Sequence, residues 1–362
     1  MAVGSNRRIP ILSDLRYAMV RPRFLPDNYV LALLSTVALA SVLPASGMAA
    51  HVFENLTVAA IALLFFLHGA KLSREAIVAG LSHWRLHLLV IACTFVLFPL
   101  LGWALRPVLE PLVTPELYAG VIYLCVLPAT VQSAIAFTAM ARGNMPAAIC
   151  SASASTLLGI FITPVLVNLL LPQMVAGAVG GQHPGALAGI GRIMLQLLVP
   201  FVAGHLLRPW IGGFVKRRAS VLKLVDQGSI LLVVYTAFSA AVIEGLWQQM
   251  PLKALLGLFF VCGVILALAI TSSTLLARRL GFSKEDEITI VFCGSKKSLA
   301  SGVPMANVLF APQAVGAMVL PLMLFHQMQL MICAVLAQRY ARRPQPAAEG
   351  AVPVAAAPAA RP

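Results

Sequence analysis

The chain has 362 residues, of which 60% are hydrophobic and only 10% are charged, and its formal net charge is +14. Soluble globular proteins carry about 25% charged residues, so this composition excludes an ordinary soluble domain. The Lys and Arg residues lie in short clusters between apolar runs, which is typical of membrane-protein loops rather than of nucleic-acid binders. We therefore expect an all-α polytopic membrane protein, held in a lipid bilayer, with no nucleic-acid partner.

Residues 1–28 form a basic arm without the pattern of a cleavable signal, and the first apolar run begins near Tyr29. About 20 apolar residues are needed for each crossing. On that criterion we predict ten transmembrane helices within one domain over residues 29–338. The spans are residues 29–46, 52–70, 86–105, 117–141, 146–171, 188–207, 225–244, 253–277, 287–310 and 314–338.

The connections between these spans indicate their orientation. Basic residues are concentrated in alternate loops, and the opposite loops hold little beyond Arg106 and Lys253. The positive-inside rule then predicts both termini in the cytoplasm, with the protein in the plasma membrane, as in a bacterial inner membrane. Residues 72–84 are amphipathic and too short to cross, so they are predicted to lie along the interface. Residues 339–362, rich in Pro and Ala, are predicted to be a disordered cytoplasmic tail.

The ninth span, ITIVFCGSKKSLASGVPMANVLF, carries Lys296 and Lys297 in its middle. A lysine at the bilayer centre costs about 2.5 to 3.5 kcal/mol on insertion scales, and such residues usually serve a function. Small and hydroxylated residues surround the pair, and they interrupt helices or supply polar partners. They include Gly294, Ser295, Ser298 and Pro304. We predict a broken helix at a polar site, with Gly294 and Pro304 as helix-breaking residues.

The fourth span is interrupted in the same way. Pro128 lies in mid-span and is followed by Thr130, Gln132 and Ser133. Because each half of the chain has five spans, a duplicated unit would insert the second time upside down. We predict an inverted repeat of residues 29–171 and 188–338, with broken fourth and ninth helices at a midplane binding site.

Other polar and acidic residues give weaker signals. Ser151 and Ser155 in the fifth span are candidate ligands, although packing of small residues between helices explains them equally well. His83 and His87 lie four residues apart, as a pair of metal ligands would, but no third ligand is near them in the sequence. The cysteines show no metal-binding spacing, so no metal site is expected. No Asp or Glu is expected deep in any span, and Glu287 is placed near a span end.

Two motifs carry a resemblance to a known family. The run LPATVQSAIAFTAMARGNMPAAICSASASTLLGIFITPVL, residues 127–166, resembles the fourth and fifth helices of the bile acid:sodium symporter family. The motif KKSLASGVP, residues 296–304, is similar to the SBF-like branch of that family. The resemblance implies a panel domain of the first, second, sixth and seventh spans and a core domain of the others, with the broken helices crossing beside a substrate cavity.

The family's sodium ligands are only partly matched. Family members hold sodium with groups on the fourth and fifth helices and a Glu-x-x-x-Gln stretch on the ninth. The resemblance therefore implies Ser133, Ser151 and Ser155 as candidate ion ligands. Val291 and Ser295 stand where that Glu and Gln would be, and Ala134 replaces an Asn.

These observations predict a secondary transporter that moves a small organic anion by alternating access. An ammonium at the crossing would replace sodium at the helix ends or contact an anionic substrate directly. Adjacent residues on a helix point about 100° apart, so one lysine is expected to face the cavity, and we favour Lys297. The expected substrate-binding residues are Lys297, Lys296, Ser295, Ser298, Gln132 and Thr130.

Three alternatives stay open at this level. They are a conventional sodium-coupled symporter of organic anions or bile acids, a passive channel, and an intramembrane lysine-dependent enzyme. No cofactor is expected beyond a coupling ion, which is sodium or a proton. The missing ligands at Val291 and Ser295 favour sodium-independent transport, with Lys296 or Lys297 carrying the charge. The sequence does not specify an oligomeric state.

Overall fold

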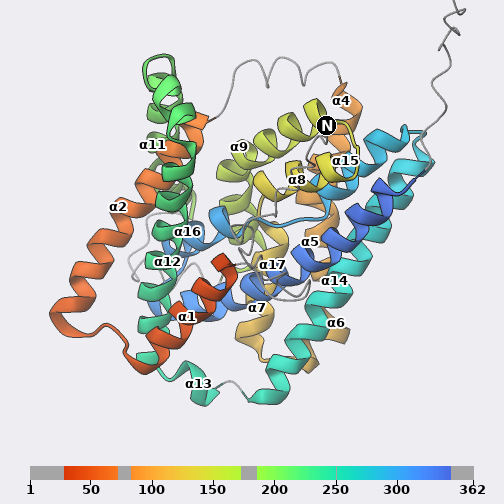
Figure 1. Ribbon diagram of the computed structural model, residues 1–362. Coiled ribbons are helices and arrows are strands. Elements are labelled where there is room, and N and C mark those ends of the chain that lie inside the picture. The colour runs from red at the N-terminus through yellow and green to blue at the C-terminus, as the bar shows by residue number, and fades with distance from the viewer. Residues whose placement is uncertain (1–27, 72–82, 173–185, 250, 344–362) are drawn as a thin grey trace, which may run out of the picture.

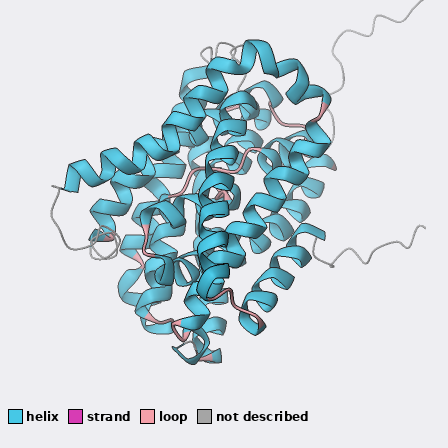
Figure 2. Cartoon of the chain, turned by 90° about the vertical axis from the view of Figure 1, so that its left-hand side faces the viewer, coloured by secondary structure: helices cyan, strands magenta, loops and turns pink. Residues whose placement is uncertain are grey.

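The computed structural model describes residues 28–71, 83–172, 186–249 and 251–343, and the regular elements in these ranges are all helices. Figure 1 shows their course, and Figure 2 shows loops inside the helical bundle as well as at its ends. The first half contains α1 (Asn28–Val42), α2 (Gly47–Lys71), α4 (Trp84–Ala92), η2 (Cys93–Leu97), α5 (Phe98–Ala104), α6 (Arg106–Leu109), η3 (Glu110–Leu112), α7 (Pro115–Val126), α8 (Gln132–Met140) and α9 (Met145–Leu170). The second half contains α11 (Ala186–Arg217), α12 (Ala219–Ile243), α13 (Leu246–Gln249), α14 (Leu252–Arg279), α15 (Lys284–Gly294), α16 (Leu299–Leu309) and α17 (Pro312–Ala341).

Seven helical stretches in the described part of the chain are long and apolar enough to cross a membrane. They are residues 47–71, 84–104, 145–170, 195–217, 219–243, 252–279 and 312–341. The first predicted span is the shorter helix α1, and the fourth and ninth are divided into two helices each. The multi-pass, all-helical class is therefore confirmed, while the count of ten crossings stays a prediction.

The two divided spans break close to where the sequence indicated. Between α7 and α8 the chain leaves the helix over residues 127–131, around Pro128. Between α15 and α16 it does so over residues 295–298, directly after Gly294. The prediction that Pro304 breaks a helix was wrong, because Pro304 lies inside α16. The chain leaves the helix earlier, at residues 295–298, and Pro304 removes only one backbone donor from α16.

A π-helical turn interrupts the third predicted span. The segment η2 separates α4 from α5, and the N–H of Phe98 donates to the carbonyl of Cys93, five residues back. The next N–H would be that of residue 99, which is Pro99 and has none. The carbonyl of Thr94 therefore lacks both its α-helical and its π-helical partner, and it is left for another donor.

Helices α1, α2, α11 and α12 pack against one another, and α2 and α11 run side by side at the left of Figure 1. The α2–α11 contact is very close. A Cβ added at Gly69 would lie 1.9 Å from the carbonyl oxygen of Phe201, and one added at Gly204 would lie 1.9 Å from that of Phe66. Two facing glycines thus let the backbones touch, as small residues do between membrane helices. The expected division into panel and core stays a prediction.

Three predicted segments fall largely outside the described residues. They are the basic arm 1–28, the interfacial segment 72–84 and the tail 339–362. The tail prediction was wrong at its beginning, because α17 continues to Ala341. Its apolar pattern and good helix formers carry the helix past the expected end of the span.

Candidate functional site

The two breaks meet inside the molecule and are joined by hydrogen bonds. The backbone N–H of Ser298 donates to the carbonyl of Pro128 at 2.9 Å. The Lys297 ammonium donates to the carbonyls of Cys125 and Leu127, both at 2.8 Å. Residues about 170 positions apart are thereby brought together, and the second break supplies donors to acceptors that the first break leaves open.

The carbonyls at the end of α7 are open because their usual helical donors are engaged elsewhere. The carbonyl of Cys125 would accept from the N–H of Ala129, but that N–H donates to Ser155 Oγ at 2.9 Å. The next carbonyl, that of Val126, accepts from Thr163 Oγ1 at 2.9 Å. Helix α9 thus supplies hydroxyls to the break, and the Cys125 carbonyl remains available to Lys297.

The Lys297 ammonium also donates to the carbonyl of Thr94 at 2.8 Å, which is the carbonyl freed by the π-turn. An ammonium has three donors, and here all three are used. The Lys297 side chain is 0% exposed, and its Nζ lies 4.2 Å from the centre of the Phe98 ring. A positive charge at this point neutralises the partial negative charge at the C-terminal end of α7.

The backbone of Lys297 is held by helix α17. The N–H of Lys297 donates to Gln329 Oε1, and Gln329 Nε2 donates to the carbonyl of Lys297, both at 2.9 Å. Gln329 is fully buried, and its Nε2 also lies 2.9 Å from His326 Nδ1. One amide side chain therefore replaces the helical partners that Lys297 loses in the break.

The neighbouring Lys296 points to different groups. Its Nζ donates to the carbonyl of Ser133 at 3.0 Å and lies 3.9 Å from the centre of the Phe137 ring and 5.3 Å from that of Phe292. Aromatic faces attract a buried ammonium without accepting all of its protons. The two lysines thus diverge, and both are fully buried in this conformation.

The predicted hydroxyl residues on the ninth span make local contacts. Ser295 Oγ donates to the carbonyl of Val291 at 2.6 Å, within its own chain segment. Ser298 caps α16, because its Oγ accepts from the N–H of Ser301 at 3.2 Å. Both residues therefore shape the break, and neither Oγ contacts a lysine ammonium through a hydrogen bond recorded among the described residues.

The candidates on the fourth and fifth spans are only partly brought together. Thr130 Oγ1 and Ser133 Oγ lie 2.8 Å apart, beside the carbonyl that holds Lys296. Gln132 is exposed at the start of α8. Ser151 Oγ lies 2.7 Å from His87 Nδ1, so it is joined to α4, whereas Ser155 reaches the break itself.

Several residues of the site were missed from the sequence. Thr94 contributes only its backbone, and the available signal was Pro99 inside an apolar span. Two acidic residues that lie near the ends of predicted spans are nevertheless buried, since Glu287 and Asp226 are only 4% and 8% exposed. Asp226 was not singled out at all, since it stands one residue inside a predicted span.

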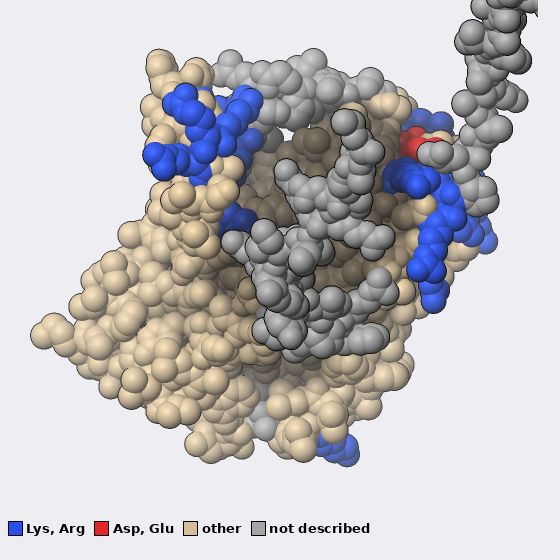
Figure 3. Space-filling model, in the orientation of Figure 1, with Lys and Arg blue, Asp and Glu red and all other residues tan. Residues whose placement is uncertain are grey.

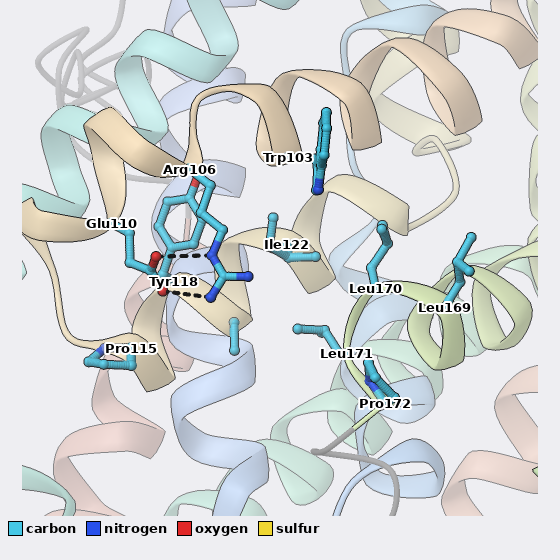
Figure 4. Close-up of a pocket in the computed structure, with 11 residues that line it drawn as sticks. Trp103, Arg106, Glu110, Pro115, Tyr118, Ile122, Leu169, Leu170, Leu171 and Pro172 are labelled. Atoms are coloured by element: carbon cyan, nitrogen blue, oxygen red, sulfur yellow. Dashed lines mark hydrogen bonds and ion pairs between the residues drawn. The ribbon is translucent and has the colours of Figure 1, made fainter.

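A separate cavity of about 440 Å³ lies away from the lysines (Figure 4). At one end Arg106 donates to both carboxylate oxygens of Glu110, at 2.9 and 3.0 Å, and this pairing lowers the pKa of Glu110. The other lining residues are Trp103, Pro115, Tyr118, Ala119, Ile122 and Leu169 to Pro172. None of the candidate site residues lines this cavity, so it is not the lysine site.

Comparison with known proteins gives consistent matches. The model of the SBF-like CPA transporter family matches residues 27–342. The "Uncharacterized protein PA2026" of Pseudomonas aeruginosa is 71% identical over 330 residues, which cover 91% of this chain and 97% of that protein. The "Putative symporter YfeH" of Escherichia coli is 60% identical over 318 residues, 88% of this chain and 93% of that protein. "Sodium/bile acid cotransporter 7" of Rattus norvegicus is 28% identical over 281 residues, 76% of this chain and 80% of that protein.

Proposed function

Because the chain belongs to the SBF-like CPA transporter family, we propose that it is a secondary transporter that moves a small organic anion by alternating access. The family consists of transporters, and the helices make this chain a multi-pass membrane protein. A buried pair of lysines at the meeting point of two divided helices supports an anionic substrate. Binding sites of secondary transporters are commonly built at such broken helices.

The observation that carries the proposal is the contact between Lys297 and three backbone carbonyls from two spans. Carbonyl oxygens at a helix break form the type of site that binds a coupling cation in other transporters. In this chain the Lys297 ammonium occupies the position of such a cation. Lys297 is therefore a fixed cation that holds the crossing together without a bound ion.

Lys296 is the better candidate for direct contact with the substrate. It has a single recorded hydrogen bond in the described structure, against three for the Lys297 ammonium. Its acceptor belongs to Ser133, next to the Thr130 hydroxyl and one residue from the exposed Gln132. When the helices around this break move apart, an anion that passes Gln132 would meet the Lys296 ammonium.

Sodium coupling is not favoured in this chain. The vertebrate relatives are named as sodium/bile acid cotransporters, whereas Val291 here is an apolar residue facing the interior. A sodium ion near two ammonium groups would be repelled strongly in a medium of low dielectric constant. We propose sodium-independent transport, with a proton as the coupling ion.

The distribution of charge supports an orientation with both termini in the cytoplasm. Lys and Arg gather at the upper left and upper right of Figure 3, and α11 ends in Lys216 and Arg217 and α14 in Arg278 and Arg279. The lower edge holds few basic residues in this view. By the positive-inside rule the upper edge is cytoplasmic. We place the protein in a bacterial inner membrane, with ten spans as an inverted repeat.

The test is uptake of a panel of labelled organic anions into proteoliposomes. Saturable uptake with counter-exchange is expected, driven by a pH gradient without sodium. Flux that neither saturates nor exchanges would indicate a channel. Strong stimulation by a sodium gradient at constant pH would overturn the sodium-independent mechanism and indicate conventional symport.

A further inference from the structure

Besides the lysine site, the described helices contain two buried carboxylates, and they differ in how they are paired. Glu287 accepts from Arg278, Lys284 and Tyr340, so both of its oxygens have partners. Asp226 receives the Lys71 ammonium on Oδ2, while its Oδ1 is buried without a hydrogen-bond partner among the described residues. A buried carboxylate oxygen left open in a membrane helix indicates a functional group rather than a structural one.

The position of Asp226 adds to this difference. It is the eighth residue of α12, about 10 Å along the helix axis from Ala219. Its side chain is 12% exposed, whereas that of Lys71, at the end of α2, is 34% exposed. The carboxylate is therefore inside, and its partner reaches the surface on the side where basic residues gather.

The groups around Asp226 come from two other helices. Helix α1 contributes the Tyr29 hydroxyl, which is also buried without a hydrogen-bond partner among the described residues. It lies close enough to Asp226 to interact with the carboxylate electrostatically. Helix α2 contributes Lys71 and His68, whose ring is held by the carbonyl of Leu64 at 2.7 Å.

The remaining neighbours of α12 add few charges at this level. Helix α11 carries His205, whose backbone lies beside Gly69, and Arg208 one turn further on. Helices α13 and α16 have no titratable side chain. Helix α17 meets α12 near its opposite end, where Gly316 lies beside Ala241.

We propose that Asp226 is the proton-binding site that couples transport to a proton gradient, with Lys71 as its exchangeable counter-ion. This inference rests on the proposed transport function. A proton binds to a carboxylate oxygen of Asp226 and forms the neutral acid, and no covalent bond is broken. The Lys71 ammonium keeps its own protons, loses its partner and turns outward, so the charge of the pair changes from zero to plus one.

Lys297 at the crossing is less suited to this role. All three protons of the Lys297 ammonium are engaged as donors, so loss of one would leave a buried carbonyl without its donor. The Lys71–Asp226 pair also joins α2 to α12 at one level, while Thr57 and Thr236 join them by a 3.0 Å hydrogen bond further along. Protonation would therefore release one end of the α2–α12 contact and leave the other in place.

The test uses the full-length protein, reconstituted in liposomes on a solid-supported membrane and exposed to pH jumps without any organic anion. The wild type is expected to give a charge transient from proton binding, and Asp226→Asn is expected to lose it. Glu285→Gln serves as the control, because Glu285 is an exposed carboxylate paired with Arg343. A wild-type protein without a transient, or a folded Asp226→Asn protein with the wild-type transient, would overturn the proposal.

A second variant, Lys71→Gln, keeps the proposal testable if Asp226→Asn does not fold. Lys71→Gln removes the ammonium that competes with the proton, so the transient should appear at less acidic pH. An unchanged pH dependence in that variant would also contradict the proposal. The charge transient is measured without substrate, so the two proposals can fail separately. If only the transport proposal fails, the wild type gives a transient but transports none of the anions tested.

Discussion

The side-chain amide of Gln329 pairs with both backbone groups of Lys297, with each hydrogen bond at 2.9 Å. Lys297 lies between α15 and α16 and so lacks helical hydrogen bonds. The Gln329 side chain, on α17, supplies these hydrogen bonds instead. This pairing fixes the direction in which the Lys297 side chain leaves the backbone, and hence which carbonyls its ammonium meets.

Substitution of Gln329 by Leu is expected to destabilise the protein. It leaves the N–H and the carbonyl of Lys297 buried without partners, at about 1 to 3 kcal/mol for each group. The measurement is thermal unfolding of the purified protein in detergent. Gln327→Leu is the matched control, because Gln327 Oε1 has no partner among the described residues. Equal unfolding temperatures for the two variants would contradict the assigned role of Gln329.

Lys297→Met is expected to abolish transport. The variant keeps an apolar side chain of similar length but leaves three carbonyls at the crossing without their donor, so the folded protein should also unfold at a lower temperature. Membrane insertion should not suffer, since a costly charge is removed. Lys297→Arg should fail in transport as well, because a planar guanidinium cannot place its donors as a compact ammonium does.

The control for these variants is Lys253→Met, which changes an exposed lysine at the start of α14. It should retain wild-type uptake and stability. Normal uptake by a well-expressed Lys297→Met protein would show that the fixed cation is dispensable.

Gly204→Ala is expected to disrupt the α2–α11 contact. Its new Cβ would lie 1.9 Å from the carbonyl oxygen of Phe66, so one backbone must move. Overpacking of this kind typically costs about 1 to 3 kcal/mol, and unfolding in detergent would measure it. Gly213→Ala in the same helix has open space around its Cβ and should stabilise by up to about 1 kcal/mol. Loss of stability in both variants would point to a general effect of substitution in α11.

The proposed topology places Ser46 and Arg342 on opposite sides of the membrane. Ser46 follows α1, and Arg342 follows α17. Ser46→Cys should react with an impermeant thiol reagent from the periplasmic side, and Arg342→Cys only after access to the cytoplasm. The six native cysteines are buried and should give little background. Labelling of both positions from one side would contradict the ten-span arrangement.

Much of the architecture followed from composition and from local breaks in the pattern. Long apolar runs require membrane-spanning helices because the bilayer core offers no hydrogen-bond partners to an unpaired backbone. Pro128 and the small residues around Lys296 marked the two divided spans for the same reason. Pro304 was a wrong indication, since it lies in the middle of α16 and removes one backbone donor there without ending the helix.

What the lysines do could only be decided by the tertiary structure. Their cost in a membrane was readable from the sequence, but their partners are mainly backbone carbonyls of residues 94, 125, 127 and 133, and side-chain identity does not mark a free carbonyl. Which carbonyls are free depends on a π-turn, on Ser155 and on the crossing of two breaks. Asp226 was not identified for a similar reason, because its burial depends on helices α1 and α2, which pack against α12, and not on its neighbours in the chain.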